Sequence, residues 1–495
     1  MSYSSSLASR TAWNAIASLI STFGRMLVAI FIARQLEPTL AGQYAFLTWL
    51  VEFIIIIISF GLPNTLTKYA AEFSTKEKKI NLFYWIMNRY IFLSFGGTII
   101  IYIIGVSYFS DITSFPIAII LPILLFIQSI SALLNAYLAG QQDFKKIAKI
   151  NILSSTTLVI SQLILVPSLG VSGALLGTTI CYAMSLIWFI PLVKKNFNQS
   201  KHYAVPDSLL KYTVYTWLAA IVSAIIWARS ELFFLNHFST HEQSGYFSVA
   251  QTLTSFVILG ANLLTGALMP HFSSIVGRNN HAKLQQDYAR LTMIVALFVF
   301  PISLGSIAIM DNLLPFVFGS AYTEAITTGA ILMATGILAF AGVGSSLIYA
   351  LGKSDFIFQW GLVGAILLII GCYLIVPTYG AVGAASIRLS IQILMVIITA
   401  IFIQRHLKIM PPYKVLFLLI ISSALSAATI KLTINYFSFM PFLSSIICGI
   451  LSYVFCLRIF KALHQEDIAT LISLTKYLPC PIRRKTIRLL HWTLG

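Results

Sequence analysis

Five ionisable residues stand deep within long apolar stretches of the sequence: Arg25, Glu52, Arg229, Glu231 and Arg388. A charge at the centre of a bilayer costs at least ~2.5–3.5 kcal/mol on insertion scales, so each of these side chains is expected to face protein or water. Arginine presents a planar set of donors that suits phosphate oxygens. The chemistry that these residues offer is therefore the binding of an anionic group, with carboxylates close by.

Arg25 and Arg229 occupy matched positions in two halves of the chain, because Trp13 and Arg25 are repeated 204 residues later as Trp217 and Arg229. Each arginine lies ~15–20 Å from the expected cytoplasmic end of its helix at ~1.5 Å per residue, and Arg388 lies roughly 10 Å from the outer face. We predict that the three arginines line a cationic substrate cavity.

The two glutamates leave a second interpretation open. Glu52 lies at a depth similar to that of Arg25, so the two side chains could form a structural ion pair instead of serving a ligand. Glu231 cannot easily pair with Arg229, because residues two apart on a helix do not face each other. We expect Glu52 and Glu231 to act as charge partners or as ion-coupling groups.

The composition places these residues in an all-α polytopic membrane protein. Of the 495 residues, 58% are hydrophobic and only 9% are charged, against roughly a quarter charged in soluble domains. Apolar stretches near the ~20 residues that cross a bilayer recur along the whole chain, without the alternation of barrel strands. We expect about fourteen transmembrane helices, at 11–33, 44–67, 84–108, 115–138, 147–167, 171–193, 212–235, 246–272, 290–313, 325–350, 356–377, 381–403, 414–436 and 440–460.

The basic residues predict the orientation of these helices. The net charge is +17, and Lys and Arg gather in alternate loops, whereas the opposite loops hold acidic residues and Arg34 as their one basic residue. This is the positive-inside pattern, and it predicts the bacterial inner membrane with both termini cytoplasmic. It also explains the charge without nucleic acid as a partner. The basic, partly apolar tail 462–495 is expected to lie on lipid headgroups, with a merely solvated tail as the alternative.

Two further motifs repeat within the chain. Tyr137-Leu-Ala-Gly-Gln-Gln-Asp-Phe recurs 212 residues later from Tyr349, and Val166-Pro-x-x-Gly-x-x-Gly-Ala recurs 210 residues later from Val376. Six crossings per repeat make the repeats parallel, an arrangement used by alternating-access carriers with a cavity between the lobes. We predict a lobe at 1–193, a cytoplasmic linker at 194–211, a second lobe at 212–404, two extra helices at 405–461 and the tail.

Enzymatic chemistry is not indicated. The sequence has no GxxxxGK[ST] phosphate loop, no HExxH, no GxSxG and no Asp-x-Asp pair, and its 15 acidic residues are scattered. The five cysteines form no CxxC pair, so no metal site is expected. We predict a transporter that needs no cofactor, and an integral transferase or polymerase is disfavoured because no loop is long enough for a catalytic domain.

Several motifs resemble the polysaccharide-biosynthesis branch of the MOP (multidrug/oligosaccharidyl-lipid/polysaccharide) superfamily. They are Phe23-Gly24-Arg25, Ala33-Arg34-x-Leu36, Ala41-Gly42-Gln43-Tyr44 and Phe60-Gly61-Leu62-Pro63, together with the two repeated motifs. The resemblance spans about 460 residues. It implies a Wzx-type flippase that moves undecaprenyl-diphosphate-linked oligosaccharide to the periplasmic leaflet for O-antigen or another surface polysaccharide, alongside other assembly proteins. A MATE-type small-molecule exporter is the alternative, and a peptidoglycan-precursor flippase stays open.

Overall fold

The computed structural model describes residues 2–73, 75–108, 115–187, 207–266, 268–278, 280–434, 436 and 441–461. The described residues form helices and turns, with no strand among them. Ten helices are long and apolar enough to cross a membrane, which confirms an all-α, multi-pass membrane protein. Helices suit this environment because their backbone groups are hydrogen-bonded within the segment. The predicted linker is largely, and the predicted tail wholly, outside the described residues.

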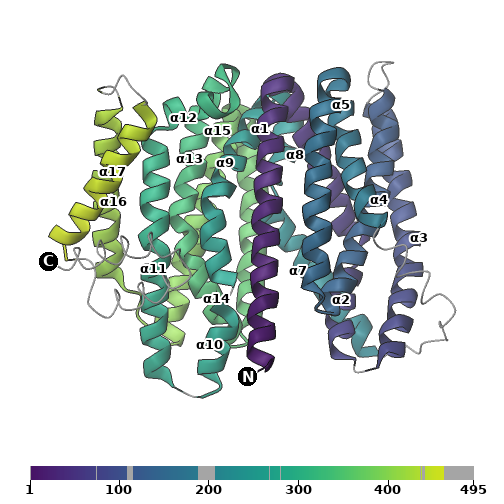
Figure 1. The fold of residues 1–495 in the computed structure, drawn as a ribbon, viewed down its shortest axis with the longest axis horizontal. Coiled ribbons are helices and arrows are strands. Elements are labelled where there is room, and N and C mark those ends of the chain that lie inside the picture. Colours follow the sequence, from purple (N-terminus) through teal and green to yellow (C-terminus); the bar gives the residue numbers. More distant parts are fainter. Residues whose placement is uncertain are drawn as a thin grey trace. The chain divides into compact units, whose positions relative to one another are not determined.

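The chain divides into two compact units, and the first contains residues 1–249 and 361–384. Its helices are α1 (Ser2–Ile58), α2 (Leu62–Glu72), α3 (Lys76–Tyr108), α4 (Phe115–Gly140), α5 (Phe144–Ile187), α7 (Asp207–Trp227), α8 (Glu231–Phe238), the start of α9 (His241–Gly266) and the middle of α15 (Ser354–His406). Helix α4 packs between α3 and α5, as Figure 1 shows in blue. Leu, Ile and Val side chains from α1, α3, α4 and α5 form the larger apolar core.

The second unit contains residues 250–360 and 385–495. Besides the remainders of α9 and α15, its described elements are α10 (Leu268–Val276), α11 (His281–Ala308), α12 (Met310–Phe318), η2 (Ser320–Ala325), α13 (Ile326–Ile337), η3 (Leu338–Ala341), α14 (Gly342–Ala350), α16 (Tyr413–Thr433) and α17 (Pro441–Ile459). Helix α16 packs against both α11 and α17. These units group helices by packing, so the predicted symmetric halves stay predictions.

Three of the long helices are broken at one residue each. Helix α1 breaks at Glu37 (φ 60°), directly before Pro38. Helices α5 and α15 break at Gly170 (φ 57°, ψ −130°) and Gly380 (φ 50°, ψ −131°), three residues after Pro167 and Pro377. Proline removes a helical donor, and glycine takes the positive φ at little cost. The repeated Val-Pro-x-x-Gly motif therefore encodes the same sharp corner twice.

Other breaks were not expected from the sequence. The predicted helix 212–235 consists of α7 and α8, which are separated by residues 228–230. The predicted helix 44–67 is likewise interrupted before α2, where Gly61 has φ 72°. The stretch expected as one helix at 325–350 contains α13, a 3-10 turn and α14. Hydropathy averages over ~20 residues, so it detects a crossing but not a local change of backbone within it.

The turn after α4 corrects one of the repeat offsets. The residue with positive φ is Gln142 in the first copy and Gly352 in the second, 210 residues apart. The i→i−5 hydrogen bond, from Asp143 N to Leu138 O and from Lys353 N to Ile348 O, has the same offset. The letter match at 212 is thus displaced by two residues from the structural match, which agrees with the offset of the glycine corners.

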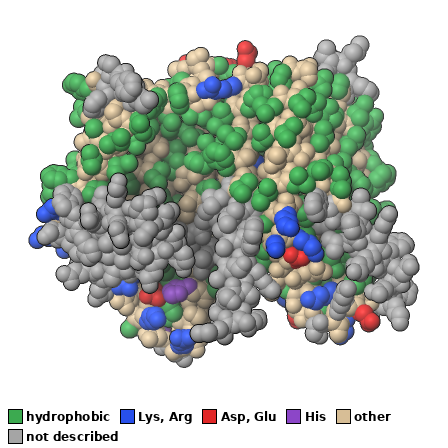
Figure 2. Space-filling model, in the orientation of Figure 1, with side chains coloured by type: hydrophobic (Ala, Val, Ile, Leu, Met, Phe, Trp, Pro, Cys, Tyr) green, Lys and Arg blue, Asp and Glu red, His purple; other side chains and the backbone are tan. Residues whose placement is uncertain are grey.

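The surface has the distribution of side chains expected of a membrane protein. Figure 2 shows hydrophobic side chains over the flanks of the helices, and most of the visible Lys and Arg side chains below them. Many large apolar residues are exposed, among them Phe92 at 78% and Ile164 at 66%. Exposed apolar area on this scale is typical of helices solvated by lipid.

Candidate functional site

Three of the predicted site residues come together in the first unit. Glu52 on α1 interacts electrostatically with Arg229 and, to a smaller extent, with Arg25. Protein surrounds the Glu52 carboxylate on most sides, and yet part of its side chain is exposed. Arg25 is likewise exposed, and Arg229 is half-buried. With Glu52 ionised, these three side chains carry one net positive charge, which suits an anion.

Arg229 is positioned by a break in the chain rather than by a helix. It has φ 60° and lies between the end of α7 at Trp227 and the start of α8 at Glu231. The break is closed by local hydrogen bonds: Ser230 Oγ donates to Ile225 O, and Leu232 N donates to Arg229 O at 3.0 Å. A non-glycine residue in the left-handed region costs roughly 1–2 kcal/mol. The surrounding packing therefore holds Arg229 in place against its backbone preference.

A polar network next to Glu52 was not predicted from the sequence. Tyr44 and Thr178 share a hydrogen bond of 2.9 Å between α1 and α5, and Gln162 Nε2 donates to Ala174 O at 2.9 Å. The charges of Glu52 and Arg25 both act on the hydroxyl of Tyr182. Tyrosine, threonine and glutamine are common in membrane helices, and the signal that could have identified them is their spacing opposite Glu52 on a neighbouring helix, which a single sequence does not give.

The other two predicted residues lie elsewhere. Glu231, at the start of α8, is fully buried in the first unit and has a polar or electrostatic partner there. Arg388 is 4% exposed on the part of α15 that belongs to the second unit, and it also has a partner. Burial of a charge is tolerated only with such partners. Neither residue is brought to the Arg25, Glu52 and Arg229 group by contacts within one unit.

The two repeats meet at a pair of equivalent glycines. A Cβ on Gly42 would lie 1.8 Å from His241 O, and a Cβ on Gly245 would lie 2.0 Å from Pro38 O. Gly42 and Gly245 are 203 residues apart, as are Pro38 and His241. Each repeat therefore presents the same glycine to the same backbone position of the other. Small residues permit this close backbone approach between membrane segments.

One glycine corner is tied to this glycine contact. The Gln243 side chain, two residues before Gly245, accepts a 2.9 Å hydrogen bond from Ala381 N through Oε1. A Cβ on Gly380 would lie 2.6 Å from the same oxygen. Helix α9 thus connects the start of the second half of α1 with the corner of α15, all within the first unit.

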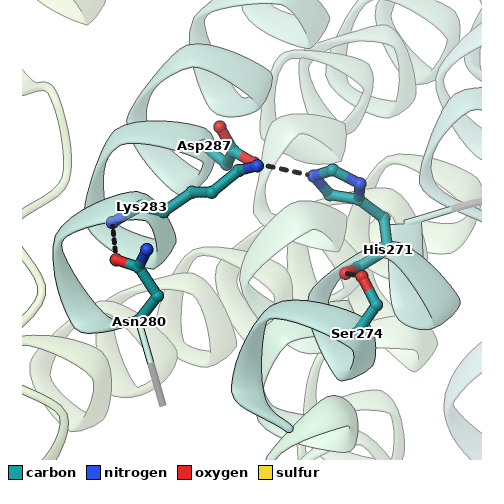
Figure 3. A network of polar contacts seen from close by, with 5 residues as sticks. All are labelled: His271, Ser274, Asn280, Lys283 and Asp287. Atoms are coloured by element: carbon teal, nitrogen blue, oxygen red, sulfur yellow. Dashed lines mark hydrogen bonds and ion pairs between the residues drawn. The ribbon is translucent and has the colours of Figure 1, made fainter. Parts of the chain in front are cut away.

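A separate polar group joins two helices of the second unit, as Figure 3 shows. His271 Nε2 on α10 lies 2.9 Å from Asp287 Oδ2 on α11, and the Asn280 side chain caps α11 by accepting from Lys283 N at 3.0 Å. His271 is half exposed, and the group belongs to the loop end that carries Arg278 and Lys283. Across the described residues, no three His, Cys, Asp or Glu side chains gather as a metal site.

Broken membrane helices beside buried and partly buried charges define a class of proteins that move polar solutes through a bilayer. The fold is that of the MOP superfamily: the lipid II flippase MurJ, in an inward closed conformation, superposes with a TM-score of 0.70, at 18% identity over 90% of this chain and 98% of MurJ. Residues 31–327 match the model of the family described as polysaccharide biosynthesis protein, so the chain belongs to that family.

Two curated relatives have names that specify flipping or polysaccharide assembly. The probable low-salt glycan biosynthesis flippase Agl15 of Haloferax volcanii is 20% identical over 93% of this chain and 97% of its own length. The lipopolysaccharide biosynthesis protein WzxC of Escherichia coli K12 is 24% identical over 46% of each chain. The resemblance read from the sequence motifs is thereby confirmed at the level of the family.

Proposed function

We propose that this protein flips undecaprenyl-diphosphate-linked oligosaccharide from the cytoplasmic to the periplasmic leaflet of a bacterial inner membrane, for O-antigen or another surface polysaccharide. The observation that carries the proposal is the exposed group of Arg25, Arg229 and Glu52, with two guanidinium groups and one carboxylate. A diphosphate needs such donors when it leaves water. The prenyl chain can stay in lipid, so the protein has to shield only the polar part.

The breaks in the helices support the predicted architecture of about fourteen crossings in two six-helix lobes with two extra helices. Helices α1, α5 and α15 each change direction at Glu37, Gly170 and Gly380, so each is long enough for two crossings. Both lobes are equivalent at the glycine corners and at the Gly42 and Gly245 contact. Alternating access would open and close the site by separating contacts of this kind. Arg388 is proposed as a third cation of the same pathway, and Glu231 as a further charge partner.

The test is a deletion of the gene in its host, followed by labelling of lipid-linked repeat units with a membrane-impermeant reagent. We expect precursors to accumulate on the cytoplasmic face, and wild type to restore their appearance outside. Arg25→Ala and Arg229→Ala should each restore less than about a tenth of the flipping rate, since each removes a charge-assisted hydrogen bond worth about 1.5–3 kcal/mol. Arg89→Ala is the matched control, because Arg89 stacks on Trp85 at 3.8 Å on α3, away from the site.

The alternative is a MATE-type exporter of small molecules, in which Glu52 would attract a cation. In that case precursors would still reach the outer face of the deletion strain, and its sensitivity to cationic drugs would rise. Loss of flipping in the arginine variants with unchanged drug sensitivity favours the flippase. If Arg89→Ala were as defective as Arg229→Ala, the arginines would serve folding and the cationic site would be wrong.

A further inference from the structure

Aromatic rings continue from the charged group along one face of the first unit. Trp49 on α1 stacks on Phe53 with centroids 5.3 Å apart, and it meets Phe233 of α8 at 6.3 Å. Phe233 in turn lies parallel to the His237 ring, with an interplanar angle of 6°. Glu52 directly precedes Phe53, so this row of rings starts beside the charged group.

The exposed face of α8 has the character of a wet surface rather than a lipid contact. Arg229, Phe233 and His237 follow at intervals of four residues, which places them along one side. Phe233 is 47% exposed and His237 is also exposed, whereas the flanking Leu232 and Phe234 are buried. An arginine and a histidine on the same side as the ring make hydrocarbon an unsuitable solvent for this face.

Two buried polar atoms beside these rings have no hydrogen-bond partner among the described residues. They are Nε1 of Trp49, whose side chain is 5% exposed, and Oδ1 of Asn236, three residues after Phe233 on the same side of α8. One is a donor and the other an acceptor. Buried polar groups are nearly always satisfied, so a donor and an acceptor left open at one place point to a ligand with hydroxyl groups.

We propose that Trp49, Phe233, His237 and Asn236 form a subsite for sugar rings of the lipid-linked glycan, directly beyond the group that holds its diphosphate. A pyranose has a face of C–H hydrogens, which match the negative face of an aromatic ring, and a rim of hydroxyls that donate and accept hydrogen bonds. A prenyl chain could use the rings but not the open donor and acceptor. The subsite rests on the proposed function and assigns the glycan to the side of the site that leads along α8.

The test compares two soluble probes, farnesyl diphosphate and farnesyl diphosphate bearing one hexose, by calorimetric titration of the full chain in lipid nanodiscs. We expect wild type to bind the hexose-bearing probe about tenfold more tightly. Phe233→Leu removes the stacking face and keeps the apolar volume, and Trp49→Phe keeps the ring and removes only the donor. Each should weaken binding of the hexose-bearing probe about fivefold and leave the bare diphosphate unchanged, because stacking and one hydrogen bond are each worth about 1 kcal/mol.

Phe92→Leu is the control, because Phe92 is a 78% exposed phenylalanine on α3 of the same unit. Equal weakening of both probes by Phe233→Leu assigns the rings to the prenyl chain and overturns the subsite. Equal binding of both probes to wild type overturns it as well, while the diphosphate site stands. If wild type binds neither probe, the proposed function itself fails, and Arg229→Ala identifies this case because it changes nothing.

Discussion

The two glycine corners have nearly the same backbone but different surroundings. Gly170 and Gly380 agree within 7° in φ and 1° in ψ, and each follows a Val-Pro pair at the same spacing. No described atom outside the immediate chain lies within 4 Å of a Cβ built on Gly170, whereas Gly380 is held by the side chain of Gln243. The repeat therefore produces two equal corners, and only one of them is fastened to another helix.

This difference shows how a repeated sequence yields an asymmetric machine. The local motif determines the corner, because proline and glycine act on the backbone at their own positions. The clamp depends on a residue in another segment, and the position that matches Gln243 in the first repeat is Leu40, which has no amide to offer. The same applies to the matched arginines, since Arg25 lies on a continuous helix and Arg229 at a break.

The largest effect is expected at the glycine pair where the repeats meet. Gly42→Ala and Gly245→Ala would each force a Cβ within about 2 Å of a backbone carbonyl oxygen, His241 O or Pro38 O, and backbone cannot move aside as a flexible side chain can. We expect each to destabilise this closed contact by about 3 kcal/mol or more. The measurement is the reaction of a cysteine introduced at Thr39 with an impermeant maleimide, together with the flipping rate.

The symmetry of the contact gives this prediction its control. Gly42→Ala and Gly245→Ala should have similar effects, and the double variant should cost less than twice the single variants because both act on one contact. Gly96→Ala on α3 should be neutral, since no described atom outside its own helix lies within 4 Å of the added methyl group. If the two variants left both the labelling rate and flipping at the wild-type level, the repeats would not be joined at this point.

The next largest effect tests whether the corners are equal. Gly170→Ala and Gly380→Ala place a Cβ on a backbone with φ near 50–57° and ψ near −130°, a combination that costs of order 1–3 kcal/mol for other residues. Both should lower the apparent unfolding temperature in detergent by similar amounts. A much larger loss at Gly380 would mean that the Gln243 clamp, rather than the backbone, determines the strain.

The sequence predicted the parts of this protein that depend on local composition. The membrane-spanning helices follow from hydropathy, and the Val-Pro-x-x-Gly motif located both corners at Gly170 and Gly380. The Tyr-x-x-Gly-x-x-Asp-Phe match was misleading in its register, because Gly352 has positive φ and Gly140 is part of α4. Identical letters two residues apart can therefore serve different turns.

The site could be predicted only in part, for a related reason. Arg25, Arg229 and Glu52 stood out because charges are rare in apolar segments. The break at Arg229 gave no signal, since Ala228-Arg229-Ser230 contains neither proline nor glycine. The partners of Gly42 lie about 200 residues away, and contacts at that separation are determined by packing that a single sequence does not specify.

A smaller effect is expected from releasing the clamped corner. Gln243→Ala removes the acceptor for Ala381 N and should destabilise the unit by about 1 kcal/mol, the usual net value of one hydrogen bond. Leu40→Ala is the matched control at the equivalent position of the first repeat, where the side chain is 45% exposed. Hydrogen exchange at the amide of Ala381 measures the release directly, and unchanged protection in Gln243→Ala would show that the two corners are equally free.

The smallest effect is expected at the helix pair α10 and α11, whose counterpart in the first repeat is the pair α2 and α3. The second-unit pair is joined by His271 and Asp287, whereas on α2 Lys68 lies over the Tyr212 ring at 4.0 Å. Both contacts are exposed, and exposed ion pairs contribute roughly 0–1 kcal/mol because water and salt screen them. His271→Ala and Lys68→Ala should therefore each change the apparent unfolding temperature only slightly, with the effect of His271→Ala shrinking further at high salt. A large loss in one pair alone would show that the asymmetry between the repeats extends from the corners to the loop ends of the helices.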